Sequence, residues 1–304
     1  MLALAALENW YITGLDVWSA YLYGKLDKEI YMEQPKGFAV PGQEHKVLRL
    51  WHALYGPKQA SLAWWHTLNE SLKELGFKCL KSKAGIFFYK KKGTNMVIEI
   101  IYVDDALFCG PNKAIVDSIK AQFMCKWECQ DLGEPNEFLR MHITRKGCAI
   151  HLDQCTYLQK VIKHCGMLNA KSASTPLPAG YYATKNTEPI DAELHSRFQT
   201  VIGSLLYLML GTRPDIAFAV THLSRHSMNP SQDHLSKVLY ICHYLIGTSM
   251  YSLVYNGGSG AGLTACTNSD WGSDPTSCLS QTGFYLKLAD GLISWTSHPQ
   301  KLST

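Results

Sequence analysis

Residues 100–108 read IIYVDDALF, and they place two adjacent acidic residues inside an apolar, β-branched run. The composition predicts a strand before the acidic pair, a tight turn at Asp104 and Asp105, and a second strand from Ala106. Neighbouring carboxylates repel each other and are costly to bury unless cations neutralise them. A divalent ion with oxygen ligands, such as Mg²⁺, meets that need. The alternative is an ordinary polar hairpin tip, because Asp is common in turns.

A third carboxylate, Asp16, lies in a similar setting near the end of the strand-like residues 10–17. It favours a metal-binding function for the acidic pair. Tyr21 follows five residues later, a spacing that can bring its ring over the same pocket as the carboxylate. Packing of Tyr21 in the core is the alternative.

The composition is that of an ordinary globular protein of one or two domains. The 304 residues are 46% hydrophobic and 18% charged, with a net charge of +4 that is compatible with nucleic-acid binding but does not establish it. The ten cysteines form no C-x-x-C pair, so we expect reduced thiols in an intracellular protein that is not secreted. The longest apolar run, residues 205–210, is too short to span a bilayer.

Strand and helix patterns alternate over the first half of the chain. This predicts the order β-α-β-β-α-β of ferredoxin-like folds. The expected helices cover residues 54–76, 112–127 and 154–165, and the expected hairpins cover residues 84–103 and 138–152. The turn of the first hairpin is assigned to the lysine-rich residues 90–95.

Lys58 and Gln59 stand at the predicted start of the first of these helices. Free N–H groups and the helix dipole favour phosphate there. A solvated first turn without a ligand is the alternative.

The second half begins with a linker at residues 169–190, which are rich in Ser, Pro, Ala and Gly. Three amphipathic helices are expected over residues 191–247, followed by strands after residue 263. His222 and His226 are four apart and could chelate a metal, but no third ligand is nearby. Because the chain starts and stops inside structural patterns, we expect further sequence on both sides.

Five blocks of sequence carry a family resemblance. The chain resembles the reverse transcriptase region of a copia-type retrotransposon Pol polyprotein, and the blocks occur in family order over residues from about 4 to 255. They read LDVWSAYLYGKLDKEIYMEQPKGF, LRLWHALYGPKQASLAWW, IYVDDALF, GSLLYLMLGTRPDIAFAV and HLSKVLYICHYLIGT.

The resemblance implies an α+β fold. A ferredoxin-like polymerase palm and thumb would occupy residues 1–168, without the fingers that precede them in the family. After the linker, residues 191–256 would form a helical connection region. Residues 263–304 would be the truncated β start of a ribonuclease H-like domain.

The resemblance also implies roles for residues at the active site. Asp16, Asp104 and Asp105 would be catalytic and would hold two Mg²⁺ ions, with Mn²⁺ as the substitute ion. Tyr21 would pack under the incoming sugar and exclude a 2′-hydroxyl. Gln59, beside Lys58, would lie near the incoming nucleotide and the template. The implied partners are an RNA template, a DNA primer or RNA–DNA hybrid, and dNTPs.

The sequence departs from the family pattern at two further sites. Leu139, Arg140 and Met141 match the primer grip, but the family usually has Gly where Arg140 stands. In the ribonuclease H-like segment, Asn268 stands where the first metal-binding Asp belongs, and Asp270 matches the second acidic position. We therefore expect no ribonuclease H activity.

Two functions follow from these observations. One is RNA-directed DNA polymerase, with attack of a primer 3′-hydroxyl on a dNTP. The other is a catalytically inactive retroelement remnant that at most binds nucleic acid, in a cytoplasmic particle or the nucleus. No membrane association is expected, and the sequence leaves the oligomeric state open.

Overall fold

The computed structural model describes residues 1–90, 96–258, 260, 262–272, 274 and 278–300. The predicted turn at residues 90–95 therefore lies outside the described residues, apart from Lys90. The chain divides into two compact units. The first contains Met1 and residues 9–135, and the second contains residues 2–8 and 136–304.

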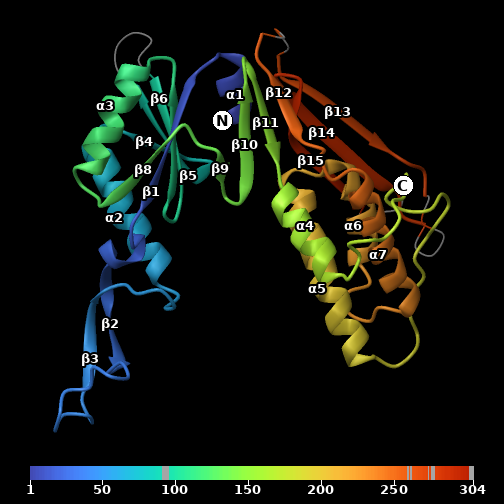
Figure 1. Ribbon diagram of the computed structural model, residues 1–304, viewed down its shortest axis with the longest axis horizontal. Helices are drawn as coiled ribbons and strands as arrows, with labels where there is room; N and C mark the ends of the chain where they lie inside the picture. The colour runs from blue at the N-terminus through green and yellow to red at the C-terminus, as the bar shows by residue number, and fades with distance from the viewer. Residues whose placement is uncertain (91–95, 259, 261, 273, 275–277, 301–304) are drawn as a thin grey trace. The chain divides into compact units, whose positions relative to one another are not determined.

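The first unit is built on a six-stranded antiparallel sheet with the order β4-β5-β6-β7-β1-β8 (Figure 1). Its strands are β1 (Tyr11–Val17), β4 (Lys78–Leu80), β5 (Lys83–Lys90), β6 (Met96–Tyr102), β7 (Asp105–Gly110) and β8 (Cys129–Gly133). The helices are α2 (Ala60–Glu74) and α3 (Lys113–Met124), and η1 (Ala20–Tyr23) is a 3₁₀ turn.

Strands β1, β6, β7 and β8 with helices α2 and α3 have the expected connection β-α-β-β-α-β. The strand β8 takes the last place in this order, although the sequence pattern placed that strand at residues 138–144. Residues 138–144 belong instead to the second unit. The short sequence Cys-Gln-Asp-Leu-Gly of β8 has no alternating apolar pattern that would have indicated a strand.

Both helices of the first unit cover one face of its sheet. Apolar residues of α2 and α3 form a single core with alternate residues of the strands. The core includes Leu15, Trp64, Phe87, Phe108 and Phe123. Helix α2 begins at Ala60 and not at residue 54, because Gly56 has φ of 124°, outside the helical region, and Pro57 disfavours helical backbone at the residue before it.

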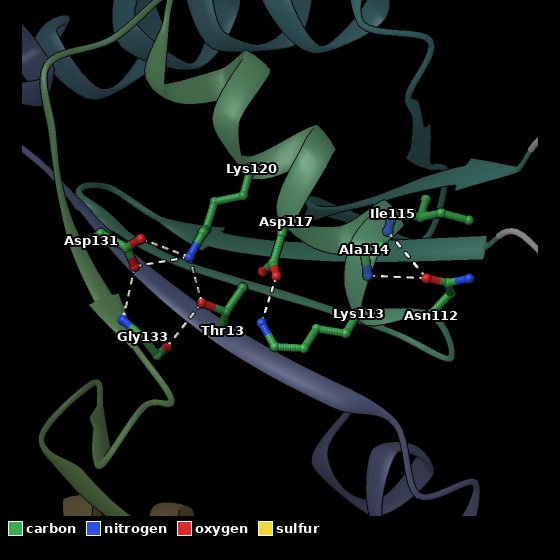
Figure 2. A network of polar contacts seen from close by, with 9 residues as sticks. All are labelled: Thr13, Asn112, Lys113, Ala114, Ile115, Asp117, Lys120, Asp131 and Gly133. Carbon is green, nitrogen blue, oxygen red and sulfur yellow. Dashed lines mark hydrogen bonds and ion pairs between the residues drawn. The ribbon is translucent and has the colours of Figure 1, made fainter.

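A buried lysine joins helix α3 to strands β1 and β8 (Figure 2). The Lys120 Nζ donates to both carboxylate oxygens of Asp131 and to Thr13 Oγ1, each at 2.9 Å. Thr13 Oγ1 donates to the Gly133 carbonyl at 3.0 Å, and the Gly133 N–H donates to Asp131 Oδ1 at 2.9 Å. The network fixes β1, the strand that carries Asp16.

A separate two-stranded ribbon is formed by β2 (Lys25–Glu33) and β3 (Val47–His52). Most of its residues are exposed.

The second unit contains an antiparallel sheet with the order β12-β11-β10-β9 and a three-stranded sheet with the order β13-β14-β15 (Figure 1). The strands are β9 (Glu137–Phe138), β10 (Met141–Lys146), β11 (Ala149–Asp153), β12 (Leu253–Asn256), β13 (Thr264–Ser269), β14 (Gln281–Leu288) and β15 (Gly291–Pro299). The last three strands occur where the sequence predicted strands after residue 263.

Helices of the second unit pack around one apolar core, which contains Phe198, Leu205, Leu208 and Val238. The helices around this core are α4 (Cys155–His164), α5 (Ala192–Gly211), α6 (Ala217–Ser224) and α7 (Gln232–Gly247), and η2 (Pro214–Ile216) precedes α6. Helix α1 (Leu2–Leu7) contacts strands β11 and β12 instead. The prediction of three helices after the linker is confirmed. Among the described residues, no helix has the length and apolar character needed to cross a membrane.

Candidate active site

Two of the predicted carboxylates face each other across neighbouring strands. Asp16 of β1 is the direct register partner of Asp105 of β7. Opposite residues of an antiparallel pair point to the same face of a sheet. The neighbours Leu15 and Val17 belong to the core under the helices, so Asp16 and Asp105 lie on the other face.

The turn before Asp105 is held from two sides. Trp64, which is 3% exposed, donates its indole N–H to the Val103 carbonyl at 2.7 Å. The Val17 N–H donates to the Asp104 carbonyl at 2.9 Å. These bonds fix the peptide units on both sides of the Asp104 Cα.

The tight turn is one residue earlier than the sequence indicated. Val103 and Asp104 form it, and Asp105 already belongs to β7, paired with Tyr102. Val103 has φ of 61°, a conformation that costs a β-branched residue free energy. The two flanking hydrogen bonds hold the backbone in this conformation.

Electrostatics favour a cation at this position. Burial and the nearby Asp104 carboxylate both raise the pKa of Asp16. Burial, followed by the charges of Asp104 and Asp16, also raises the pKa of the Tyr55 hydroxyl. A cation bound between these groups would attract each of them and so offset the repulsion between their negative charges.

The donor chemistry of Asp16, Asp104 and Asp105 fits Mg²⁺ or Mn²⁺, because both ions prefer oxygen ligands. Within the part of the chain that is described, however, no three His, Cys, Asp or Glu side chains form a group ready to hold an ion. The repulsion that raises the pKa of Asp16 is a physical reason for bare carboxylates to stay apart.

Two tyrosines stand next to the carboxylates. The rings of Tyr21 and Tyr55 lie 4.7 Å apart between centroids and are tilted by 49°. Tyr55 is 56% exposed, so its ring is open to a ligand. The sequence interpretation singled out Tyr21 but not Tyr55, although Tyr55 lies in the quoted block LRLWHALYGPKQASLAWW.

Lys58 and Gln59 are both exposed, and Gln59 is the N-cap residue of α2. Gln59 lines a surface pocket of about 430 Å³ together with Lys25, Lys28 and His66. The described lining of this pocket includes neither the three carboxylates nor Tyr21. The structure thus pairs Asp16 with Asp105, places Asp104 near Asp16 and packs Tyr21 against Tyr55. Gln59 lies on a separate pocket.

The residues matched to the primer grip belong to the second unit. Leu139 and Arg140 form a tight turn between β9 and β10, with Met141 paired to Phe138. The φ angles of Leu139 and Arg140 are 51° and 60°. Gly adopts this left-handed conformation without steric cost, so the structure gives a physical reason for Gly at position 140. The Leu139 carbonyl accepts a 2.9 Å hydrogen bond from the Tyr207 hydroxyl.

The ribonuclease H-like positions lie at the end of the exposed strand β13. Asn268 Oδ1 accepts from the next backbone N–H, of Ser269, at 2.9 Å. Asp270 Oδ1 accepts from the Gln281 N–H at 2.8 Å. Both side chains therefore take part in local hydrogen bonding.

His222 and His226 belong to no group of three metal-ligating side chains among the residues that the structure describes. His222 Nε2 accepts the Ala183 N–H at 3.0 Å. The ring of His226 packs 4.2 Å from that of His234, and burial together with His234 lowers the pKa of His226 to about 4. These rings hold helices and linker together.

Comparison with protein families matches residues 1–179 to the family described as reverse transcriptase (RNA-dependent DNA polymerase). The chain is 35% identical, over 99% of its length, to the retrovirus-related Pol polyprotein from transposon TNT 1-94 of Nicotiana tabacum. It is 32% identical, again over 99% of its length, to that from transposon RE1 of Arabidopsis thaliana. The chain spans 23% and 20% of these two polyproteins.

A putative transposon Ty5-1 protein of Saccharomyces cerevisiae is 29% identical, and the match covers 94% of this chain and 93% of that protein. The family match covers more than half of the chain, and it includes all three carboxylates and Tyr21. The chain belongs to the reverse transcriptase family, as a region of a copia-type retrotransposon Pol polyprotein.

Proposed function

We propose that the first unit is the palm of an RNA-directed DNA polymerase that extends a primer 3′-hydroxyl with dNTPs on an RNA template. The observation that carries the proposal is the placement of Asp16 opposite Asp105, beside a turn whose backbone is fixed around Asp104. Such preorganisation keeps charged groups in place without reorganisation during the reaction.

The three carboxylates would hold the divalent ions. When bound, these ions would supply activation of the primer hydroxyl and charge stabilisation at the phosphates. Tyr21, with Tyr55 against it, would form an aromatic surface under the sugar of the incoming nucleotide.

The proposal also assigns the remaining regions. Within residues 1–168, the palm would lie in the first unit and the thumb would begin after residue 135. Residues 169–190 would be a linker, residues 191–256 a connection region, and residues 263–304 the start of a ribonuclease H-like domain without activity. Lys58 and Gln59 would contact nucleotide or template from the α2 N-terminus. An intracellular location, in a cytoplasmic particle or the nucleus, fits this role.

A second candidate is a non-catalytic remnant that binds nucleic acid only. The observation that favours it is Arg140, which occupies a left-handed turn position where the family usually has Gly. Asn268, at the position of a metal-binding Asp, supports it in the ribonuclease H-like segment.

Primer extension distinguishes the two candidates. The protein is incubated with an RNA template, a DNA primer, dNTPs and Mg²⁺, beside an Asp104→Asn/Asp105→Asn control. The polymerase proposal expects extension that falls by about 10³-fold or more in the control, because ligand charge and transition-state stabilisation are lost together. Folded protein that retains salt-sensitive nucleic-acid binding without extension would establish the remnant.

A further inference from the structure

Two cysteine side chains meet in the helical part of the second unit. Cys165 directly follows the last residue of α4, and Cys242 lies inside α7, 77 positions later. Their Sγ atoms are 4.0 Å apart, with the Cys242 S–H directed to the Cys165 sulfur. A disulfide requires about 2.05 Å between the sulfurs. The two sulfurs must therefore approach by about 2 Å to form the bond, through side-chain rotation or a shift of the packed helices.

The backbone holds Cys165 in place. Gly166, with φ of 71°, donates its N–H to the Lys163 carbonyl at 3.0 Å, and Met167 donates to the Ile162 carbonyl at 3.0 Å. These two bonds form a Schellman motif, which ends the helix with a defined geometry. Cys242 is fully buried in the core of the unit. Both sulfurs are thus held near each other by the fold and not by a mobile loop.

The two thiols differ in their environment. Cys165 is half-buried, and the S–H of Cys242 together with the charge of Arg197 lowers the pKa of its thiol. The hydrogen bond to Cys165 and deep burial raise the pKa of Cys242. Since the thiolate is the nucleophile, Cys165 is the thiol that reacts first with an oxidant, and Cys242 is the thiol that then reacts with oxidised Cys165.

We propose that Cys165 and Cys242 form a peroxide-sensitive thiol pair whose oxidation links α4 to α7 through a disulfide. The Cys165 thiolate attacks one peroxide oxygen, the O–O bond breaks, and hydroxide leaves, so that Cys165 becomes a sulfenic acid. The Cys242 sulfur then attacks the Cys165 sulfur. The S–S bond forms, the S–O bond breaks, and the hydroxyl group leaves as water with the Cys242 proton. The two thiols lose two electrons in total, and the peroxide gains them.

Non-reducing peptide mapping after treatment of the whole chain with hydrogen peroxide tests the proposal. We expect a linked pair of peptides that contains both cysteines, lacks two hydrogens and is released by dithiothreitol. The Cys165–Cys242 link should form about tenfold faster than any other cysteine pair, because both thiolate character and proximity favour it. The control variant Cys125→Ser removes an exposed cysteine of the other unit and should leave the link unchanged.

The variants Cys242→Ala and Cys242→Val provide a second readout that does not depend on the disulfide. With its partner removed, oxidised Cys165 should persist as a sulfenic acid that a 1,3-dione labels, whereas the original chain shows little label at Cys165. Thermal unfolding of both variants checks that the helical core is retained. Two results would overturn the proposal. One is Cys165 that stays reduced while the exposed Cys125 is oxidised, and the other is Cys165 linked to a cysteine other than Cys242.

Discussion

Lys120 and Glu99 are two buried ionisable residues of the same sheet-and-helix unit, and their surroundings are opposite. Lys120 is 7% exposed and donates to three oxygen atoms of Thr13 and Asp131 (Figure 2). Glu99 is fully buried, and neither of its carboxylate oxygens has a hydrogen-bond partner among the described residues. Its neighbours across the sheet are Phe87 and Phe108.

The comparison shows that burial alone does not decide the charge state of a residue. An ion that forms hydrogen bonds with an opposite charge can stay ionised, whereas burial without a partner favours the neutral form of an acid. Accordingly, the hydrogen bond from Lys120 lowers the pKa of Asp131, and burial raises the pKa of Glu99 well above its ordinary value. Lys120 thus joins β1 and β8, while burial without a partner among the described residues favours the neutral form of Glu99.

Removal of the Lys120 charge should have the largest effect on stability. Lys120→Met keeps the length of the side chain but leaves Asp131 and Thr13 without their shared donor. Because the Asp131 side chain is 47% exposed and can be hydrated, we expect a loss of about 2–3 kcal/mol, below the value for a fully buried pair. Denaturant unfolding at neutral pH measures it.

The control for Lys120 lies on the same helix. Lys113 forms an exposed ion pair with Asp117, four residues on, at 2.6 Å (Figure 2). Lys113→Met should cost less than about 0.5 kcal/mol, since exposed pairs of this kind contribute little. Equal losses for the two variants would show that the buried network adds nothing beyond helix propensity.

Replacement of Glu99 should shift stability in the opposite direction. Glu99→Leu removes two buried oxygens that have no hydrogen-bond partner in the described part of the chain, and we expect a gain of about 1–3 kcal/mol at neutral pH. Glu99→Gln keeps the shape and polarity but cannot ionise. It therefore separates the cost of burying a polar group from the cost of keeping the carboxyl group protonated. A loss of stability in both variants would mean that the carboxyl group has a partner in solution.

The pH dependence of unfolding provides the sign of the Glu99 effect. A raised pKa means that the folded chain binds more protons than the unfolded chain once the pH exceeds the unfolded value of about 4.3. The contribution of Glu99 protonation to the free energy of unfolding is therefore complete below that value. It falls as the pH rises toward the folded pKa. For Asp131, whose pKa is lowered, the contribution is present above the unfolded value and is lost as the pH falls. In Glu99→Gln the fall at higher pH should be smaller.

The sequence contained part of the signal for both residues. In β6, the alternation of Val97, Glu99 and Ile101 places Glu99 on the core face by strand period alone. In α3, Lys120 lies four residues after Val116 and so shares its buried face. The partners could not be predicted in the same way, because Asp131 lies on β8, a strand without a recognisable pattern.

At the candidate site, too, the local sequence predicts the strands but not the contacts between distant residues. The strand-like settings of Asp16 and the acidic pair follow from local composition, and the structure brings Asp16 and Asp105 into register. The exact turn residue and the contact of Tyr55 with Tyr21 depend on how α2 and its preceding loop pack on the sheet. Such contacts join residues that are distant in sequence, and a local pattern carries no information on them.

Replacement of Arg140 should change stability less than replacement of Lys120 or Glu99, because the cost at Arg140 is conformational and not electrostatic. With φ of 60° in the turn between β9 and β10, a side chain is strained and Gly is not. Arg140→Gly should stabilise the second unit by about 0.5–1 kcal/mol, after subtraction of the extra freedom that Gly gives the unfolded chain. Lys146→Gly at the exposed end of β10 is the matched control and should destabilise by a similar amount, because Lys146 does not have a positive φ.

If both glycines destabilise equally, the left-handed turn is not strained in solution. If Arg140→Gly also raises primer extension while Lys146→Gly does not, position 140 limits how the primer is held, and the arginine separates this chain from an efficient polymerase.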